Sequence, residues 1–257
     1  HPDSAAHTLP TRLIDGTVRF HLPASSCSVT GVHFSVTMNY GDATSANQGC
    51  TDMLFTRCYM DGGFSVAENA GSSTTFDQCF LLNDINSFSI GNSVTVRNSV
   101  CNGDYSNSGV ISYDHCFIFG NEIGSDASVS YQDCVLARTT ALNSSSGTYS
   151  HCLLYNWTLD QGALNVGCII SPTNPFVNSN NFYPAFPQYG DDLHLAAGNP
   201  GIGAASDGTD IGLYGGSTPL KPGYVPYNPH YLNINIAGAT NANGELPVNI
   251  TVARQTN

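Results

Sequence analysis

One short phrase occurs three times between Val110 and Leu154, and this repetition constrains the fold more than any other feature of the chain. The copies are Ile111–Ile118 (ISYDHCFI), Val129–Leu136 (VSYQDCVL) and Gly147–Leu154 (GTYSHCLL). Their cysteines lie at positions 116, 134 and 152, so the spacing is 18 residues both times. A short fixed period of this kind is typical of solenoid and repeat proteins.

Within each copy, apolar and polar residues alternate on both sides of a bend. In the first copy Ile111 and Tyr113 precede a two-residue bend, Asp114-His115, and Cys116 and Ile118 follow it. Residues i and i+2 of a strand share a face, so four side chains per copy are predicted to point inward. The phrase therefore predicts two short strands joined by a bend.

The same register extends over most of the chain and predicts four inward columns. The first is Cys27, Met53, Thr74, Val94, Ile111, Val129 and Gly147. The second is Val29, Phe55, Phe76, Val96, Tyr113, Tyr131 and Tyr149. The third is Val32, Cys58, Cys79, Ser99, Cys116, Cys134, Cys152 and Cys168. The fourth is Phe34, Met60, Leu81, Cys101, Ile118, Leu136, Leu154 and Ile170.

One coil cannot bury its inward face alone, whereas stacked coils form a continuous core. The columns therefore predict an all-β fold, a parallel β-helix of about eight or nine coils. Because neighbouring strands lie about 4.8 Å apart, the rod is expected to be roughly 40 Å long.

These columns resemble those of the right-handed parallel β-helix proteins of bacteria, a group that includes pectate lyases, polygalacturonases and many surface proteins. The resemblance covers about residues 14–216. A second resemblance lies in Asp191–Gly216, which is similar to the closing coil of secreted, Bacteroidetes-like β-helix proteins. Asn199 and Gly201 replace the Ser and Ala usual there. The resemblance implies a right-handed helix and secretion, but fold does not imply function.

Composition limits the partners that we expect. Of the 257 residues only 10% are charged, seven are Lys or Arg, and the net charge is −12. Nucleic acid and anionic membranes are therefore unfavourable partners. No apolar run approaches the roughly 18 residues that a membrane span needs. The chain begins at His1 without a signal peptide, and we interpret it as a processed, extracellular or cell-surface protein.

Nine cysteines would ordinarily suggest disulfides or a metal site. Six of them fall in the third inward column, and no Cys-x-x-Cys or zinc-finger spacing occurs. We therefore expect buried free thiols and no resident metal there. A bridge between Cys27 and Cys50 remains an alternative.

The chain divides into two predicted domains. Residues 1–216 form the β-helix with its N-terminal arm and closing coil, and residues 217–257 form a Pro-rich connector and a β-hairpin. Apolar residues alternate with polar ones on both sides of the turn signal Asn243-Gly244. These apolar residues are Leu232, Ile234, Ile236, Val248, Ile250 and Val252. A lone hairpin is marginally stable, so we expect it to dock on its own solenoid or on a neighbouring molecule.

An aromatic segment and several modification triplets mark the expected surface. Phe182, Tyr183 and Phe186 lie in the irregular stretch 172–190. They are expected either to bind sugars or another protein, or to cap the open end of the solenoid. The candidate glycosylation sites are Asn143, Asn156, Asn249 and Ser4.

Two further columns carry polar groups. The turn after the fourth column holds Asp61, Asn83, Asp84, Asp104, Asn121, Glu122 and Asn156. It either binds calcium or only caps turns. The bend column holds Arg57, Gln78, Asn98, His115, Asp133, His151 and Gly167. Stacked His115, Asp133 and His151 could bind a transition metal or act as acid and base, or form a hydrogen-bonded ladder.

Two functions follow as hypotheses. The favoured one is a non-catalytic, extracellular structural or adhesive solenoid that assembles through its hairpin with copies of itself or with a cell-surface polysaccharide. The alternative is a polysaccharide lyase or glycoside hydrolase. Of the polygalacturonase-like motifs only Asp191-Asp192 is present. Arg57 and Arg97, placed in the bend column, and Arg138 are the candidate bases. The candidate catalytic residues are Asp84, Asp104, Asp133 and His151, and calcium is the one cofactor considered.

Overall fold

The structure is a computed structural model of the chain. It describes residues 18–20, 26–40, 49–66, 71–83, 85–87, 92–102, 109–120, 129–144, 147–159, 164–182, 185–188, 191–220, 230–236, 239–241 and 243–253. Within these ranges the side chains of 65–66, 86–87, 140–144, 230–236 and 251–253 are not described. None of the described residues is helical, so they contain no helix that could cross a membrane.

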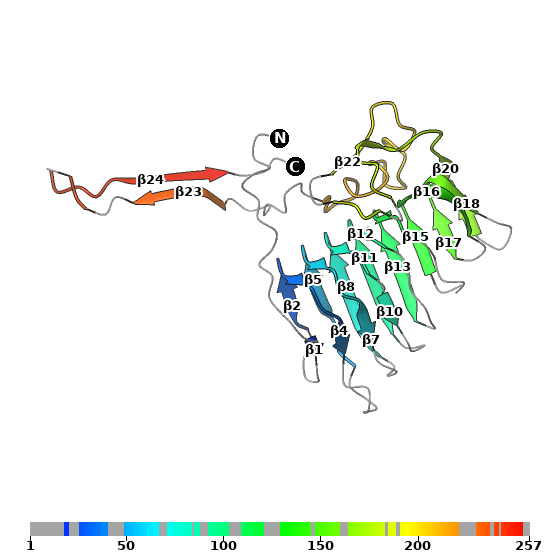
Figure 1. Ribbon diagram of the computed structural model, residues 1–257, viewed down its shortest axis with the longest axis horizontal. Coiled ribbons are helices and arrows are strands. Elements are labelled where there is room, and N and C mark those ends of the chain that lie inside the picture. The colour runs from blue at the N-terminus through cyan, green and yellow to red at the C-terminus, as the bar shows by residue number, and fades with distance from the viewer. Residues whose placement is uncertain are drawn as a thin grey trace. The chain divides into compact units, whose positions relative to one another are not determined.

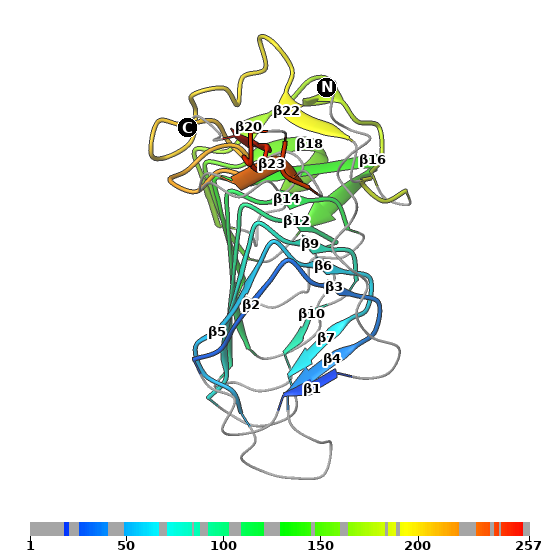
Figure 2. The same ribbon diagram turned by 90° about the vertical axis from the view of Figure 1, so that its left-hand side faces the viewer.

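The first part of the chain is a parallel β-solenoid, as predicted (Figures 1 and 2). The first sheet consists of β2 (Ser28–Thr30), β5 (Met53–Thr56), β8 (Ser73–Asp77), β11 (Ser93–Arg97), β13 (Val110–Asp114), β15 (Val129–Gln132), β17 (Thr148–Ser150) and β19 (Leu164–Val166). The second sheet consists of β3 (His33–Phe34), β6 (Tyr59–Met60), β9 (Phe80–Leu81), β12 (Val100–Cys101), β14 (Phe117–Ile118), β16 (Val135–Ser144), β18 (Leu153–Leu159) and β20 (Ile169–Ile170). Each sheet therefore has eight strands, in agreement with the predicted coil number.

A third parallel sheet closes the early coils. It consists of β1 (Val18–Phe20), β4 (Met38–Tyr40), β7 (Phe64–Val66) and β10 (Ile85–Ser87). In the later coils β16 and β18 continue past a register shift between Ala137 and Leu142, so that Leu142 pairs with Trp157. Trp157 is buried in the interior, which is how these longer strands help to close the coils.

The strand register confirms the predicted inward columns. Tyr113 pairs with Tyr131 and Tyr131 with Tyr149, and their rings stack at centroid distances of 5.1 and 4.9 Å. In the fourth column Ile118 pairs with Leu136 and Leu136 with Leu154. Stacking equivalent side chains removes large apolar surface from water, which is the main favourable term in folding.

The bend is tighter than predicted. Asp114 belongs to β13, so His115 alone turns the chain, instead of the pair Asp114-His115. Each bend residue has a positive φ, between 42° and 69°. These residues are Gly31, Arg57, Gln78, Asn98, His115, Asp133, His151 and Gly167. A single left-handed residue turns the chain from the first sheet into the second, and most side chains adopt this conformation only when the surrounding fold imposes it.

The third column does more than fill space. The backbone N–H of Cys58 donates to the sulfur of Cys79 over 3.4 Å, and that of Cys79 donates to the Ser99 hydroxyl over 2.9 Å. The bend interrupts backbone pairing, and these side chains accept the N–H groups left over. Ser99 fits among cysteines for this reason. Seven of the nine cysteines are buried thiols, as expected, whereas Cys168 is half-buried and Cys27 is exposed.

A second apolar layer, which we did not predict, lies outside the second sheet. Its strand residues Phe117, Val135 and Leu153 alternate with inward ones and are fully buried. The chain that follows the last coil covers them, with Phe176 4.7 Å and Phe182 6.0 Å from Phe117 between ring centroids. The prediction that this aromatic segment caps the open end of the solenoid is therefore wrong. It packs on the flank, where β21 (Phe176–Asn178) and β22 (Asp192–Leu195) pair.

The chain divides into two compact units, His1–Leu220 and Lys221–Asn257. In the second unit β23 (His230–Ile236) and β24 (Val248–Ala253) form the predicted antiparallel hairpin. Ile234 lies opposite Ile250 and Ile236 opposite Val248. At the turn, Asn241 accepts hydrogen bonds from the backbone of Asn243 and Glu245. The predicted N-terminal arm lies outside the described residues.

Candidate functional site

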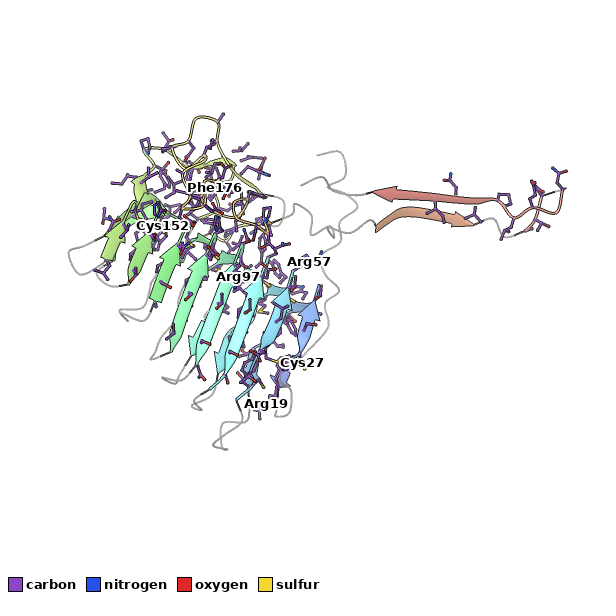
Figure 3. All side chains as sticks on the ribbon, turned by 180° about the vertical axis from the view of Figure 1, so that it is seen from behind. Arg19, Cys27, Arg57, Arg97, Cys152 and Phe176 are labelled. Carbon is purple, nitrogen blue, oxygen red and sulfur yellow. The ribbon has the colours of Figure 1, made fainter. Side chains whose placement is uncertain are left out.

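The residues of the bend column bind the last part of the first unit. We call residues 199–220 the closing strap. Along its length it hydrogen-bonds, in order, to Ser171, Asp133, His115, Asn98 and Gln78. The strap therefore runs back along the solenoid, from the last coils toward the early ones, over the bends (Figure 3).

Asp133 is the most completely engaged of these residues. One carboxylate oxygen accepts the backbone N–H of Ser206 and the other accepts its hydroxyl, both over 2.6 Å. Its backbone carbonyl also accepts the N–H of Gly212 over 2.8 Å. Asp133 is fully buried, and charge-assisted hydrogen bonds of this kind offset the cost of burying a carboxylate.

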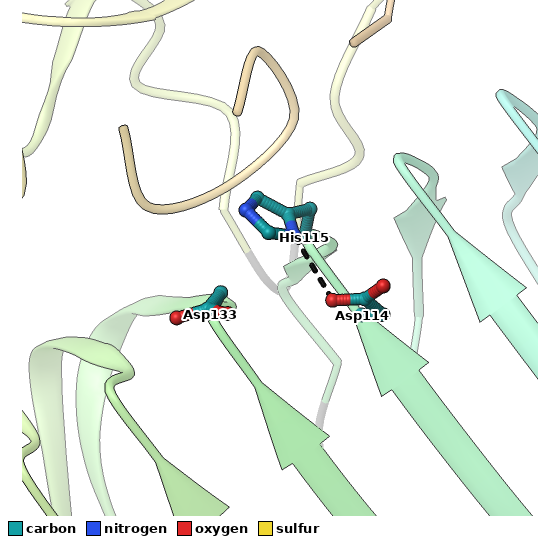
Figure 4. A group of neighbouring side chains, drawn as sticks. All are labelled: Asp114, His115 and Asp133. Atoms are coloured by element: carbon teal, nitrogen blue, oxygen red, sulfur yellow. Dashed lines mark hydrogen bonds and ion pairs between the residues drawn. The ribbon is translucent and has the colours of Figure 1, made fainter. Parts of the chain in front are cut away.

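His115 lies between two carboxylates, one on each side of the interface. Its Nδ1 is 2.9 Å from the Asp114 carboxylate (Figure 4). Its Nε2 is 3.8 Å from the carboxylate of Asp207 in the strap. Burial lowers the pKa of His115, but the hydrogen bond to Asp114 and the charges of Asp114, Asp133 and Asp207 outweigh it, so the pKa is raised above its usual value of 6.5. The site thus favours an imidazolium that joins strap and solenoid.

Glycines allow the strap to lie this close. A Cβ on Gly215 would overlap the carbonyl oxygen of Asp210 and lie 2.6 Å from the His115 ring. A Cβ on Gly212 would lie 2.7 Å from Val135. Close backbone approach is the reason that only glycine fits at these positions.

Asp114, His115 and Asp133 offer ligand atoms within 4.8 Å of one another, the distance range of a metal site. Their donor atoms are, however, already engaged. Both oxygens of Asp133 bind Ser206, and the two nitrogens of His115 face Asp114 and the strap. Of the alternatives for the bend column, the geometry fits the hydrogen-bonded ladder best.

The other predicted acid–base residues are only partly described. Asp84 and Asp104 lie outside the described residues. His151 occupies the bend above Asp133, where its Nδ1 is 3.0 Å from the Ser150 hydroxyl. The prediction that Arg97 lies in the bend column is wrong, because Arg97 ends β11 and Asn98 turns the chain. Arg138 is buried on β16, away from solvent.

The predicted ligand and assembly residues divide into two groups. Phe182 is only 3% exposed and has no free ring face, whereas Phe186 is 42% exposed and packs edge-on against Phe119. Val248 and Ile250 on the hairpin are both about half exposed. Tyr183 and the side chains of Leu232, Ile234, Ile236 and Val252 lie outside the description.

The sites considered for glycans and calcium are only partly described. The Asn156 side-chain nitrogen, the atom that a glycan would take, donates to the carbonyls of Arg138 and Thr139. Asn249 is exposed on β24, and Asn143 pairs with Thr158 through its backbone. Ser4 lies outside the described residues. In the calcium column, Asp61 binds His33 over 2.6 Å, and Asp84, Asp104 and Glu122 are not described.

Sequence reasoning missed the strap residues Ser206, Asp207 and Thr209. Thr209 donates to Asp207 over 2.6 Å and accepts the N–H of Gly216, which fixes the strap's own turn. They resemble ordinary turn residues, and their partners lie 73 to 94 positions away, so no local pattern pairs them. The apolar residues that follow Cys116, Cys134 and Cys152 did carry a signal, because they indicate that the outer face of the second sheet is covered too.

No protein-family model matches the chain, and neither a curated protein nor a solved structure is significantly similar to it. The case for a function therefore rests on the geometry of the chain itself.

Proposed function

We propose that the chain is a non-catalytic structural or adhesive β-solenoid, exported by a bacterium to the extracellular space or cell surface, that associates with copies of itself through its C-terminal hairpin. One observation carries the proposal. The cluster best suited to chemistry, Asp114, His115 and Asp133, is engaged by the chain's own closing strap. Groups that hold the fold together in this way are not free to act on a substrate.

The hairpin supports the assembly part of the proposal. Two-stranded hairpins are marginally stable alone, and three or more strands or a packed face are needed for independent stability. Leu246, Val248 and Ile250 are each about half exposed in their own unit. An apolar strand of this kind is suited to adding to a partner's sheet, which is a known mode of recognition.

The test is self-association of the full chain, measured by sedimentation velocity and light scattering across a range of concentrations. Ile250→Lys places a charge on the apolar face and is expected to reduce assembly. Asn249→Lys is the matched control, because residue 249 points to the opposite face of the same strand and is already polar. A wild-type chain that is monomeric at every concentration would overturn the assembly proposal, as would equal assembly of the two variants.

A second candidate, a carbohydrate-active enzyme, is favoured by one observation. Burial raises the pKa of Asp77, even though the guanidinium groups of Arg97 and Arg57 oppose the shift. Asp77 lies opposite Arg97 in neighbouring strands. A carboxyl group with a raised pKa is a candidate general acid, the role that one of the two carboxyl groups has in glycoside hydrolysis.

This candidate is tested by incubating the full chain with acidic and neutral polysaccharides and measuring unsaturated products and new reducing ends. Activity lost in Asp77→Asn and retained in Asp52→Asn, an exposed control, would favour the enzyme. No release from any polysaccharide would leave the structural proposal in place. Asp84, Asp104, Asp133 and His151 are the next substitutions.

A further inference from the structure

Both ends of the solenoid present unpaired strand edges within the part of the chain that is described. The first sheet ends at β2 on one side and β19 on the other, and the second ends at β3 and β20. An open edge carries a row of N–H and C=O groups that can pair with another chain. Two adjacent sheets end together at each end of the rod, and at the N-terminal end the third sheet also ends, at β1.

The edge strands are only two or three residues long, but they lack the other features that block pairing. Natural proteins protect edges with charged residues, proline or bulges. β19 reads Leu-Asn-Val and β20 reads Ile-Ile, while β2 reads Ser-Val-Thr and β3 reads His-Phe. None of the four contains Asp, Glu, Lys, Arg or Pro, although the chain carries a net charge of −12. These four strands therefore bring no carboxylate, Lys or Arg to a contact between two copies.

The C-terminal edge is also apolar and uncovered. Leu164 is 65% exposed, Val166 58% and Ile170 70%. Ile170 ends the inward column in which Ile118, Leu136 and Leu154 are all buried. This end of the core therefore stops with an apolar side chain in water, a surface that favours coverage.

The N-terminal edge continues the same columns. Val29 and Phe34 stand in the second and fourth inward columns, where Val29 is partly buried and Phe34 is buried. Its strands run in the same direction as all others in their sheets, so a second copy in line would extend both sheets in parallel. Continued columns would put Leu164 opposite Ser28, Val166 opposite Thr30 and Ile170 opposite Phe34 of the next copy.

We propose that two copies of this chain join head to tail, with β19 and β20 of one copy pairing with β2 and β3 of the next. The contact uses different surfaces on the two copies and does not close, so it produces a filament. It rests on the proposed structural function and adds a second contact, independent of the hairpin.

The experiment measures self-association of full-length variants by sedimentation velocity and negative-stain microscopy. Leu164→Lys replaces an apolar side chain of the edge strand with a charge, which blocks edge pairing, and is expected to weaken association about tenfold. Adding Ser28→Asp to Leu164→Lys places opposite charges face to face only in the head-to-tail arrangement, and is expected to restore filaments. Val110→Lys, at an exposed position in the middle of the same sheet face, is the matched control and should assemble like the wild type.

Each outcome decides between the two contacts. The head-to-tail joint is supported if Leu164→Lys loses assembly, if adding Ser28→Asp restores it, and if Val110→Lys assembles like the wild type. Normal assembly of Leu164→Lys, or no restoration by the double variant, overturns the joint. If Ile250→Lys abolishes assembly and Leu164→Lys does not weaken it, the hairpin proposal stands and the head-to-tail joint fails. A wild-type chain that never associates overturns both.

Discussion

The inner core and the outer layer of this solenoid are built by different means. Inside, equivalent residues of successive coils stack in columns, as Tyr113, Tyr131 and Tyr149 do. Outside the second sheet, the strand residues are equally buried, but an irregular chain from the last coil covers them. The inner core is thus fixed by repetition, whereas the outer layer depends on contacts between residues far apart in sequence. The two layers should therefore respond differently to damage.

Two buried leucines on neighbouring strands compare the layers directly. Leu136 points inward and Leu153 outward, and both are fully buried. Leu136→Ala is expected to lower the free energy of unfolding by about 4 kcal/mol, toward the upper end of the range for such changes. Leu153→Ala is expected to cost about 2 kcal/mol, because the irregular chain can move in to fill the space. Chemical denaturation measures both, and equal losses would contradict the proposed difference.

One methyl group added at Gly215 is expected to displace the closing strap. Gly215→Ala would drive a Cβ into the backbone of Asp210 and the ring of His115, with an expected cost of about 2–3 kcal/mol. Gly208→Ala is the control, since nothing lies within 4 Å of its Cβ; Gly208, unlike Gly215, has a positive φ, so only about 1 kcal/mol of backbone strain is expected. Hydrogen exchange of the strap amides should rise in Gly215→Ala alone, and unchanged exchange would mean that the strap tolerates the methyl group.

The Asp133–Ser206 contact should be the main attachment of the strap. Asp133→Ala removes the acceptor of two 2.6 Å hydrogen bonds and is expected to destabilise the strap by about 2 kcal/mol. Gln132→Ala, which loses one longer bond to the same serine, should cost less. Proteolysis within 199–220, followed by mass spectrometry, measures the difference. Equal cleavage rates would show that the carboxylate is dispensable.

The smallest expected effect is a dependence of the attachment of the closing strap on pH. Folding raises the pKa of His115. Its contribution to stability is therefore complete below the unfolded-state pKa of about 6.5 and is lost as the pH rises through the folded-state pKa. The pKa of Asp207 is lowered, chiefly by its hydrogen bonds to Thr209, so its contribution is present above about 3.9 and lost at lower pH.

The strap should therefore be held best between about pH 4 and 6.5. His115→Gln should remove the loss of stability above that window and leave the inner core unaffected. Denaturation midpoints of the wild type and the variant, compared from pH 5 to 9, give the result. A parallel pH profile in the two proteins would exclude His115 as the group that titrates.

The sequence predicted the inner core well and the candidate site only in part. The period of 18 residues and the alternation around each Cys placed Ile118, Leu136 and Leu154 in one column, because strand geometry alone decides which side chains share a face. It also placed His115 and Asp133 in one bend column. It did not reveal that the strap would occupy them, and it misplaced Arg97 because the bend proved to be one residue long.

What the sequence by itself determined is the local and periodic part of the structure: the strands, their register, the stacked columns and the C-terminal hairpin. Only the tertiary structure decided where the closing strap lies and that the cluster of Asp114, His115 and Asp133 joins it to the solenoid. The physical reason is that alternation acts between neighbours in the chain, whereas Ser206 and Asp133 meet only after the coils have stacked and brought positions 73 residues apart into contact.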